Sequence, residues 1–191
     1  PALQIMLPVG ISFYIFQNIG YVWDVYKGRV PAEKSFAKYL LFISYFPKFT
    51  VGPIERAKGF MPQMQREMRE FSYANAVAGL RIIMIGLFKK VAVADVLAPV
   101  VNNVFDNPAE YTGLSLIIAT ILYTFQIYCD FSGYADLAIG YSRMLGINLM
   151  QNFHSPYFSK SISEFWRRWH ISLSSWFRDF VYIPLGGNRV C

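Results

Sequence analysis

Residues 111–129 carry no charged side chain over their whole length, and residues 1–23 share this property. A helix that crosses the hydrocarbon core of a bilayer needs about 20 consecutive apolar residues, so both stretches are long enough to span a membrane. A segment inside lipid must satisfy its backbone hydrogen bonds internally, so each stretch is expected to be helical. The two stretches therefore predict an all-α protein with multi-pass transmembrane helices.

The overall composition supports the same class. Hydrophobic residues make up 54% of the 191 residues and charged residues only 16%, against about 25% in soluble domains. The formal net charge is +6, and the positive residues gather in short connections between apolar stretches. A nucleic-acid-binding protein instead carries its basic residues on the surface of a polar chain. The pattern indicates basic cytoplasmic loops in contact with a lipid bilayer, and no nucleic acid as a partner.

Residues 36–53 are less regular. They are apolar, but Pro47, Gly52 and Pro53 interrupt their second half, and the loops on both sides are basic. Positive loops favour the cytoplasm, so this stretch is expected to enter and leave the membrane on one side. We interpret it as a re-entrant or interfacial piece whose open backbone is covered by protein or water.

A further apolar stretch, residues 73–101, contains Lys89 and Lys90. The lysine pair is expected to divide this stretch into a span and an interfacial helix. The chain begins inside an apolar stretch and stops just after a glycine pair. We therefore expect residues 1–191 to be a single membrane domain that forms an internal fragment of a longer protein.

The uncharged stretch 111–129 ends at Asp130, and Asp136 follows in the sequence DFSGYAD. Both aspartates could lie at the membrane surface. Alternatively, ionisable groups beside a span line a polar cavity. The sequence leaves both interpretations open, and it predicts a short separate helix over residues 137–149.

Residues 161–188 carry the strongest pattern in the chain. Ser161 and Glu164 have the spacing of a capping box, which predicts that a helix begins here. His170 would lie one turn after Trp166 and one turn before Ser174 on this helix. Apolar side chains recur at three- and four-residue steps along it, which is typical of a basic, aromatic helix at a membrane interface. They are Trp166, Trp169, Leu173, Trp176, Phe177 and Phe180.

His170 is the candidate catalytic residue. A neutral imidazole can accept a proton from an alcohol while that alcohol attacks an acyl thioester. On the alternative interpretation, the histidine is merely accommodated in a structural helix. The second histidine, His154, lies in a loop before a proline and is expected to be a cap or solvated.

Three arginines near His170 are candidates for holding the phosphates of a cytosolic acyl carrier, because guanidinium groups bind phosphate well. Their alternative role is to anchor the protein by reaching lipid phosphates. They are Arg167, Arg168 and Arg178. The sequence contains no Gly-rich phosphate loop, G-x-S-x-G motif or metal-ligand cluster, so neither a metal nor a tightly bound cofactor is expected.

Five stretches resemble the membrane-bound O-acyltransferase family, and they run over nearly the whole chain. The two that contain Asp130 and His170 are the most specific, because chance agreement at their length is not credible. The resemblance is closest to the bacterial branch that O-acetylates alginate or peptidoglycan. The stretches are LPVGISFYIFQNIGY (7–21), FPKFTVGPIERA (46–57), GLFKKVAVAD (86–95), QIYCDFSGYADLAIG (126–140) and FWRRWHISLSSWFRDFVYIPLGGNR (165–189).

The resemblance implies a multi-pass enzyme of the bacterial inner membrane, with helices around a funnel and re-entrant pieces that thin the barrier. An acetyl group from a cytosolic thioester, acetyl-CoA, would be passed to an extracytoplasmic polysaccharide with the help of periplasmic acetyltransferase partner proteins. His170 matches one of the family's two important histidines. The second belongs to a Trp-His-Gly motif beyond this sequence, so the fragment is expected to be inactive alone. Ser174, Asp130 and Gln126 join the arginines as candidate substrate-binding residues.

Two other functions stay open. The branch of the family that transfers D-alanine from a carrier protein shares the aspartate–phenylalanine motif and the tryptophan–histidine pair, although residues 182–189 fit the acetyl branch better. From a different class, a proton- or ion-coupled transporter would use Asp130, Asp136 and His170 as an ion path. A transporter has no need of the second histidine, so that residue would separate the two classes.

Overall fold

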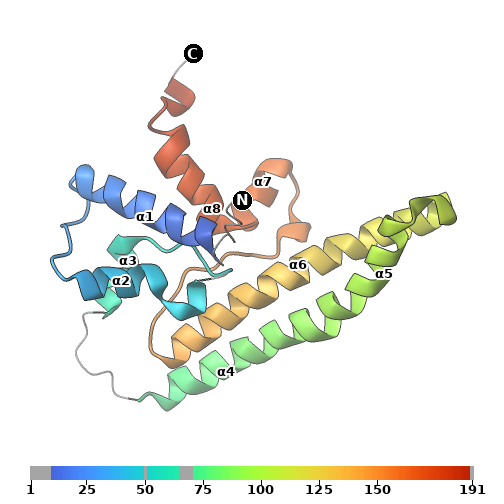
Figure 1. The fold of residues 1–191 in the computed structure, drawn as a ribbon, viewed down its shortest axis with the longest axis horizontal. Coiled ribbons are helices and arrows are strands. Elements are labelled where there is room, and N and C mark those ends of the chain that lie inside the picture. The colour runs from blue at the N-terminus through green and yellow to red at the C-terminus, as the bar shows by residue number, and fades with distance from the viewer. Residues whose placement is uncertain (1–9, 50, 65–70, 190–191) are drawn as a thin grey trace, which may run out of the picture.

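The computed structural model describes residues 10–49, 51–64 and 71–189, and these residues form helices and turns without any strand. The all-α prediction is therefore confirmed for this part of the chain. Figure 1 shows two parts: a long helical hairpin made by α4, α5 and α6, and a group of shorter helices, α1–α3 with α7 and α8, beside one end of it.

The first arm of the hairpin is one continuous helical path. It comprises α4 (Tyr73–Leu87), the π-helical segment η2 (Phe88–Ala94) and α5 (Asp95–Asp106). The expected division at the lysine pair is wrong, because the backbone passes through Lys89 and Lys90 by widening to a π-helix instead of breaking. A π-helical turn keeps the backbone hydrogen-bonded while shifting the register of the side chains that follow.

The second arm is α6 (Gly113–Met144), a helix of 32 residues. It follows the short η3 turn (Pro108–Glu110). The helix does not end at residue 129 as the charge pattern predicts, because Asp130 and Asp136 are paired with lysines of the first arm. Lys90 Nζ lies 2.6 Å from Asp130 Oδ1, and Lys89 Nζ lies 2.6 Å from Asp136 Oδ2. The ion pairs let the helix carry these charges, so the separate helix expected over residues 137–149 is absent.

Glycines bring the two arms into backbone contact at two levels. A Cβ atom on Gly86 would lie 2.8 Å from the carbonyl oxygen of Gly133, and one on Gly140 would lie 2.7 Å from the carbonyl oxygen of Gly79. Small residues at this spacing let helices approach closely, as is common where lipid offers no hydrophobic driving force for association. The glycines therefore set the distance between α4 and α6.

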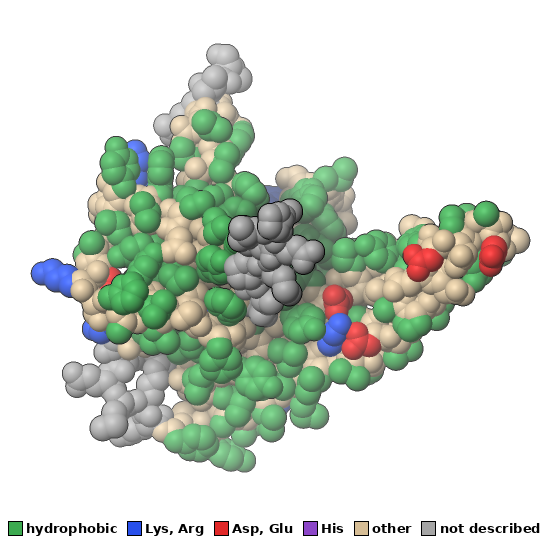
Figure 2. All heavy atoms as spheres, in the orientation of Figure 1, with side chains coloured by type: hydrophobic (Ala, Val, Ile, Leu, Met, Phe, Trp, Pro, Cys, Tyr) green, Lys and Arg blue, Asp and Glu red, His purple; other side chains and the backbone are tan. Residues whose placement is uncertain are grey.

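Among the described residues, α6 is the one helix long and apolar enough to cross a membrane, and only 11% of its most apolar window is buried. A helix of 32 residues is about 48 Å long. That exceeds the ~30 Å hydrocarbon core of a bilayer. Figure 2 shows hydrophobic side chains spread across the visible face, with few charged side chains among them. The first predicted span is described only in part, as α1 (Ile11–Tyr26), because residues 1–9 lie outside the described residues.

The stretch 36–53 does not form one helix. It gives α2 (Phe36–Ser44), with only nine residues, and the 3-10 turn η1 (Phe46–Lys48), after which the chain turns back. Nine helical residues are too few to cross a bilayer. Together with α3 (Ala57–Met64) and the chain after α6, these elements enclose a hydrophobic core. Its buried residues are Phe42, Ile43, Tyr45, Ala57, Phe60, Met61, Ala138, Ile147 and Leu149.

Lys48 is fully buried within this group of helices. Its Nζ lies 4.3 Å and 4.4 Å from the ring centroids of Phe42 and Phe60 and donates a hydrogen bond to Gln17 Oε1 of α1. The aromatic faces and the amide replace the water that the ammonium group loses. Burial lowers the pKa of Lys48, since the charged form is the one that desolvation penalises.

The glycine contacts give a first prediction. Gly86→Val places a Cβ against the Gly133 carbonyl, which cannot move without shifting α6, so we expect a loss of about 1–3 kcal/mol of folding stability. Thermal unfolding of the purified protein in detergent measures this loss. Gly113→Ala on α6 is the matched control, because no atom lies within 4 Å of its added Cβ. Equal melting temperatures for the two variants would contradict the proposed role of the glycines.

Candidate active site

The helix that carries the candidate arginines begins as the sequence predicts. In α7 (Ile162–Arg168), Ser161 Oγ accepts a hydrogen bond from the backbone N–H of Glu164 at 3.1 Å. The Glu164 carboxylate reaches back to the N–H of Lys160 at 2.8 Å. The predicted N-terminal cap is therefore confirmed, with the glutamate bonding one residue further back than in a standard capping box.

The continuous helix predicted over the following residues is wrong. The chain leaves the helix after Arg168, and His170 adopts a left-handed conformation, with φ 42° and ψ 55°, before α8 (Ile171–Phe177) begins. The π-helical segment η5 (Arg178–Tyr182) continues α8. A left-handed backbone is uncommon for a residue with a Cβ, and such strain clusters at functional sites. His170 therefore lies at a corner between two short helices.

The segment just before α7 holds this corner in place. The N–H of His154 donates to the carbonyl of Arg168 at 2.9 Å, and the N–H of Ile171 donates to the carbonyl of Asn152 at 2.9 Å. The side-chain oxygen of Asn152, which is 1% exposed, also accepts from the N–H of Ser172 at 3.3 Å. Backbone groups freed by the break are thus bonded on both sides of His170.

A second connection joins the corner to the stretch FPKFTVGPIERA. Ser172 Oγ accepts a hydrogen bond from the N–H of Ile54 at 3.1 Å, and both residues are buried. Nearby, the Glu55 carboxylate accepts from the N–H of Met150 at 2.6 Å. Two stretches that lie more than a hundred residues apart in the sequence therefore meet beneath the corner.

The His170 imidazole is packed between aromatic rings. The Phe131 ring of α6 approaches it edge-on, with centroids 4.6 Å apart, and the Phe153 ring lies parallel to it at 6.4 Å. Its Nε2 atom is buried and has no hydrogen-bond partner among the described residues. An unpaired buried nitrogen is costly in a finished core, so each such atom in a native structure calls for an explanation.

The apolar surroundings also fix the charge of the imidazole. Burial lowers the pKa of His170 to about 4, because desolvation penalises the protonated form. Near neutral pH the ring is therefore neutral, which is the state in which a histidine can accept a proton. Among the described residues, no group of three or more His, Cys, Asp or Glu side chains is placed to hold a metal ion.

The other candidates on α7 and α8 are placed differently. Arg168 forms an ion pair with Glu164 at 2.5 Å, whereas Arg167 is exposed. The Ser174 hydroxyl donates to the carbonyl of Trp169 at 3.3 Å, so it closes the first turn after the corner. Of these side chains, that of Ser174 is bonded to the corner itself.

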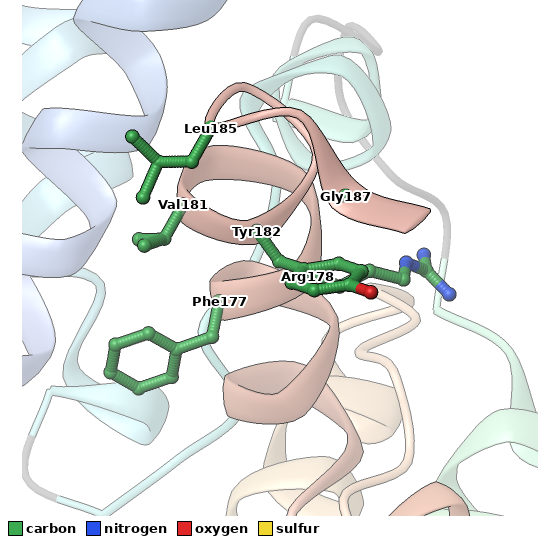
Figure 3. Close-up of a pocket in the computed structure, with 6 residues that line it drawn as sticks. All are labelled: Phe177, Arg178, Val181, Tyr182, Leu185 and Gly187. Carbon is green, nitrogen blue, oxygen red and sulfur yellow. The ribbon is translucent and has the colours of Figure 1, made fainter. Parts of the chain in front are cut away.

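Arg178 lies on η5, away from the corner. Its Nε lies 2.8 Å from Asp179 Oδ1, and it lines a cavity of about 410 Å³ together with apolar side chains. Figure 3 shows Phe177, Val181 and Leu185 along one side of the helix, while the Arg178 guanidinium points away from them. The structure therefore does not bring Arg178 next to His170.

The candidates on α6 lie close to the corner in the chain but have other partners. Asp130 pairs with Lys90, whereas the next residue, Phe131, packs on His170. Gln126 is half-buried, and its Oε1 has no hydrogen-bond partner among the described residues. Successive residues on a helix point about 100° apart, which explains how α6 faces the lysines and the histidine at once.

The sequence interpretation missed Asn152, Phe153 and Ser172. Asn152 lies in the loop that precedes the proline, and the sequence alone does not distinguish a buried asparagine from a solvated one. The one available signal was the restricted backbone of the sequence NFHSP, where a proline follows closely. That signal indicates a turn, but it does not indicate which helix the turn supports.

With this geometry described, comparison with known proteins defines the class. Residues 31–190 match the membrane-bound O-acyltransferase family, and the chain belongs to this family. The predicted resemblance is therefore confirmed.

Individual relatives cover nearly all of the chain. It is 45% identical over 186 residues to the probable alginate O-acetylase AlgI of Azotobacter vinelandii, covering 97% of this chain and 37% of that protein. It is 38% identical to the peptidoglycan O-acetyltransferase of Helicobacter pylori, covering 98% of this chain and 40% of that protein. It is 31% identical to the teichoic acid D-alanyltransferase of Bacillus subtilis, covering 92% of this chain and 45% of that protein. The chain thus spans less than half the length of these relatives.

The neutral buried imidazole gives a prediction about pH. In the unfolded chain His170 protonates near its ordinary pKa of about 6.5, whereas in the folded protein it stays neutral down to about pH 4. Protons therefore favour the unfolded state, and folding stability falls as the pH drops from 6.5 towards 4. His170→Asn should reduce this fall, and asparagine tolerates the left-handed backbone. Unfolding followed at several pH values measures the effect.

The matched control is His154→Asn, because His154 is exposed. This variant should show the same loss of folding stability between pH 6.5 and pH 4 as the unmodified protein. If His170→Asn retained the full pH dependence, the imidazole would not be the group responsible.

Proposed function

We propose that the protein is an O-acyltransferase that moves an acetyl group from a cytosolic thioester, acetyl-CoA, towards an extracytoplasmic polysaccharide of the alginate or peptidoglycan type. The supporting relatives are an alginate O-acetylase and a peptidoglycan O-acetyltransferase. The D-alanyltransferases share less sequence with this chain, so acetyl transfer is favoured over D-alanyl transfer.

The observation that carries the proposal is the unpaired Nε2 of His170. It is buried beside Phe131 and Phe153, at a backbone corner that is hydrogen-bonded to Asn152. A neutral imidazole with a free nitrogen in a fixed position is what general base catalysis requires. A merely structural histidine would be expected to use that nitrogen in a hydrogen bond.

In the proposed reaction, His170 Nε2 accepts the proton of an acceptor hydroxyl while the hydroxyl oxygen attacks the thioester carbonyl. The new C–O bond forms and the C–S bond breaks. The imidazolium then returns its proton to the departing thiolate, so the histidine ends neutral. The aromatic shell keeps water away from the imidazole, which limits hydrolysis of the donor.

The surroundings of this reaction are proposed as well. The protein would be a multi-pass component of the bacterial inner membrane, with its basic loops in the cytoplasm. Periplasmic acetyltransferase proteins would complete the transfer to the polymer. The proposal favours an enzyme over a transporter, because Asp130 and Asp136 are paired with lysines of the hairpin instead of facing His170.

The test replaces the proposed base in the full-length protein. His170→Asn should reduce polymer acetylation at least about 100-fold, the order expected when a general base is lost. Acetyl groups released by mild alkali from the isolated polymer measure the product, and membrane fractionation checks insertion. His154→Asn serves as the matched control and should acetylate normally.

The acceptor and donor are identified in the same experiment with radiolabelled acetyl-CoA. Label in the polymer that disappears with His170→Asn supports acetyl transfer. Normal acetylation by His170→Asn in membranes would remove His170 from the mechanism.

A further inference from the structure

Glu55 is a buried carboxylate that the proposed reaction leaves without a role. It is 7% exposed and lies in the segment between η1 and α3. Burial of a carboxylate costs free energy unless hydrogen bonds or an opposite charge offset that cost, so glutamates are rarely buried. Its Oε1 atom accepts a hydrogen bond from the N–H of Met150 at 2.6 Å. The segment that begins at Met150 therefore indicates what this buried group is for.

Residues 150–154 form one wall of the corner at His170. The backbone and side-chain oxygens of Asn152 accept the N–H groups of the two residues that follow the histidine, at 2.9 and 3.3 Å. The Phe153 ring lies parallel to the imidazole, with centroids 6.4 Å apart. The N–H of His154 donates to the carbonyl two residues before the histidine, at 2.9 Å. Three consecutive residues of this segment therefore contact the corner.

The backbone at Glu55 joins this wall to the corner from below. The preceding residue, Ile54, donates its N–H to Ser172 Oγ at 3.1 Å, and Ser172 is fully buried. Two neighbouring residues thus bond to the two sides of the site, one to the corner and one to Met150. These two bonds fix the wall and the corner relative to each other.

The surroundings of Glu55 make the length of its side chain more important than its charge. Burial raises the pKa of Glu55, while the Met150 N–H and the charge of Lys48 act in the opposite direction. Burial also lowers the pKa of Lys48 to about 7, and its Nζ donates to Gln17 Oε1. An oxygen of Glu55 can accept the Met150 N–H whether or not the carboxyl group is protonated. The hydrogen bond therefore requires the oxygen to reach Met150, and it does not require a negative charge.

We infer that Glu55 is a positioning residue for His170, because its hydrogen bond to Met150 fixes residues 150–154 and these residues hold the imidazole in its buried place. This inference rests on the proposed function. It extends that function to a side chain that does not touch the reacting atoms and acts through the segment between them.

Two conservative variants of the full-length protein separate reach from charge. Glu55→Gln keeps an oxygen at the same distance from the backbone, whereas Glu55→Asp keeps the charge and is shorter by one methylene group. Glu55→Asp should lower kcat for acetyl transfer at least about tenfold, because misplacing a catalytic group by about 1 Å is that costly. Its KM for acetyl-CoA should stay unchanged. Glu55→Gln should retain the kcat of the unmodified protein. Transfer of label from radiolabelled acetyl-CoA to the polymer in membranes measures both constants.

The pKa of His170 gives a second measurement that does not depend on acetylation. Burial lowers this pKa to about 4. Water that enters beside a displaced Phe153 should raise it towards its ordinary value. The pH dependence of folding stability that His170→Asn removes should therefore be smaller in the Glu55→Asp background. Unfolding of the unmodified protein, both single variants and the double variant between pH 6.5 and pH 4 isolates this difference, because the titration of residue 55 and Lys48 cancels.

Glu33→Asp is the matched control, because Glu33 Oε1 accepts the N–H of Ser35 at 2.9 Å within its own loop. It should leave kcat and the pH dependence unchanged. Equal kcat values for Glu55→Asp and the unmodified protein would overturn the inference. So would a loss of kcat in Glu55→Gln, which would assign Glu55 to balancing the charge of Lys48. Retained acetylation by His170→Asn would remove the proposed base alone, and the pH dependence in the Glu55→Asp background would still decide the role of Glu55.

Discussion

Where a helix is interrupted at a site shielded from water, the backbone N–H and C=O groups that lose their helical partners need other hydrogen bonds. The corner at His170 depends on this requirement. Asn152 and His154 supply the hydrogen bonds on either side of the corner, and Ser172 ties it to Ile54. Because these backbone groups are bonded, the corner can hold a histidine in a left-handed conformation. These bonds use backbone groups and the Asn152 side-chain oxygen, and they leave the imidazole Nε2 without a hydrogen-bond partner among the described residues.

The hairpin contributes the other wall of this site. Close glycine contacts fix α4 against α6, and lysine–aspartate pairs let both helices keep charged side chains near their contact. With α6 fixed, Phe131 is positioned against His170. The imidazole is therefore enclosed by elements from distant parts of the chain: α6, the segment at Phe153, and the corner itself. Burial by all three keeps it neutral.

Much of the fold could be predicted from the sequence, because its evidence is local. The helical class, the cap at Ser161 and the apolar character of α6 follow from side-chain type and spacing. The errors arose where tertiary contacts override a local pattern. The charges of Asp130 and Asp136 predicted the end of a span, but Lys90 and Lys89 pair with them and α6 continues. The aromatic stripe that includes Trp176 predicted a helix face at the membrane interface. Trp176 is instead buried, and its Nε1 donates a hydrogen bond to the carbonyl of Phe16 in α1.

The sequence by itself determined the family, the candidate histidine and the basic character of the loops, because these are properties of residue type and order. Only the tertiary structure decided that the chain breaks at His170, that Asn152 and Ile54 support the break, and that the imidazole Nε2 is buried without a hydrogen-bond partner among the described residues. The physical reason is that hydrogen-bond partners and burial depend on residues far apart in the chain. A helical period cannot report a partner that approaches from another element.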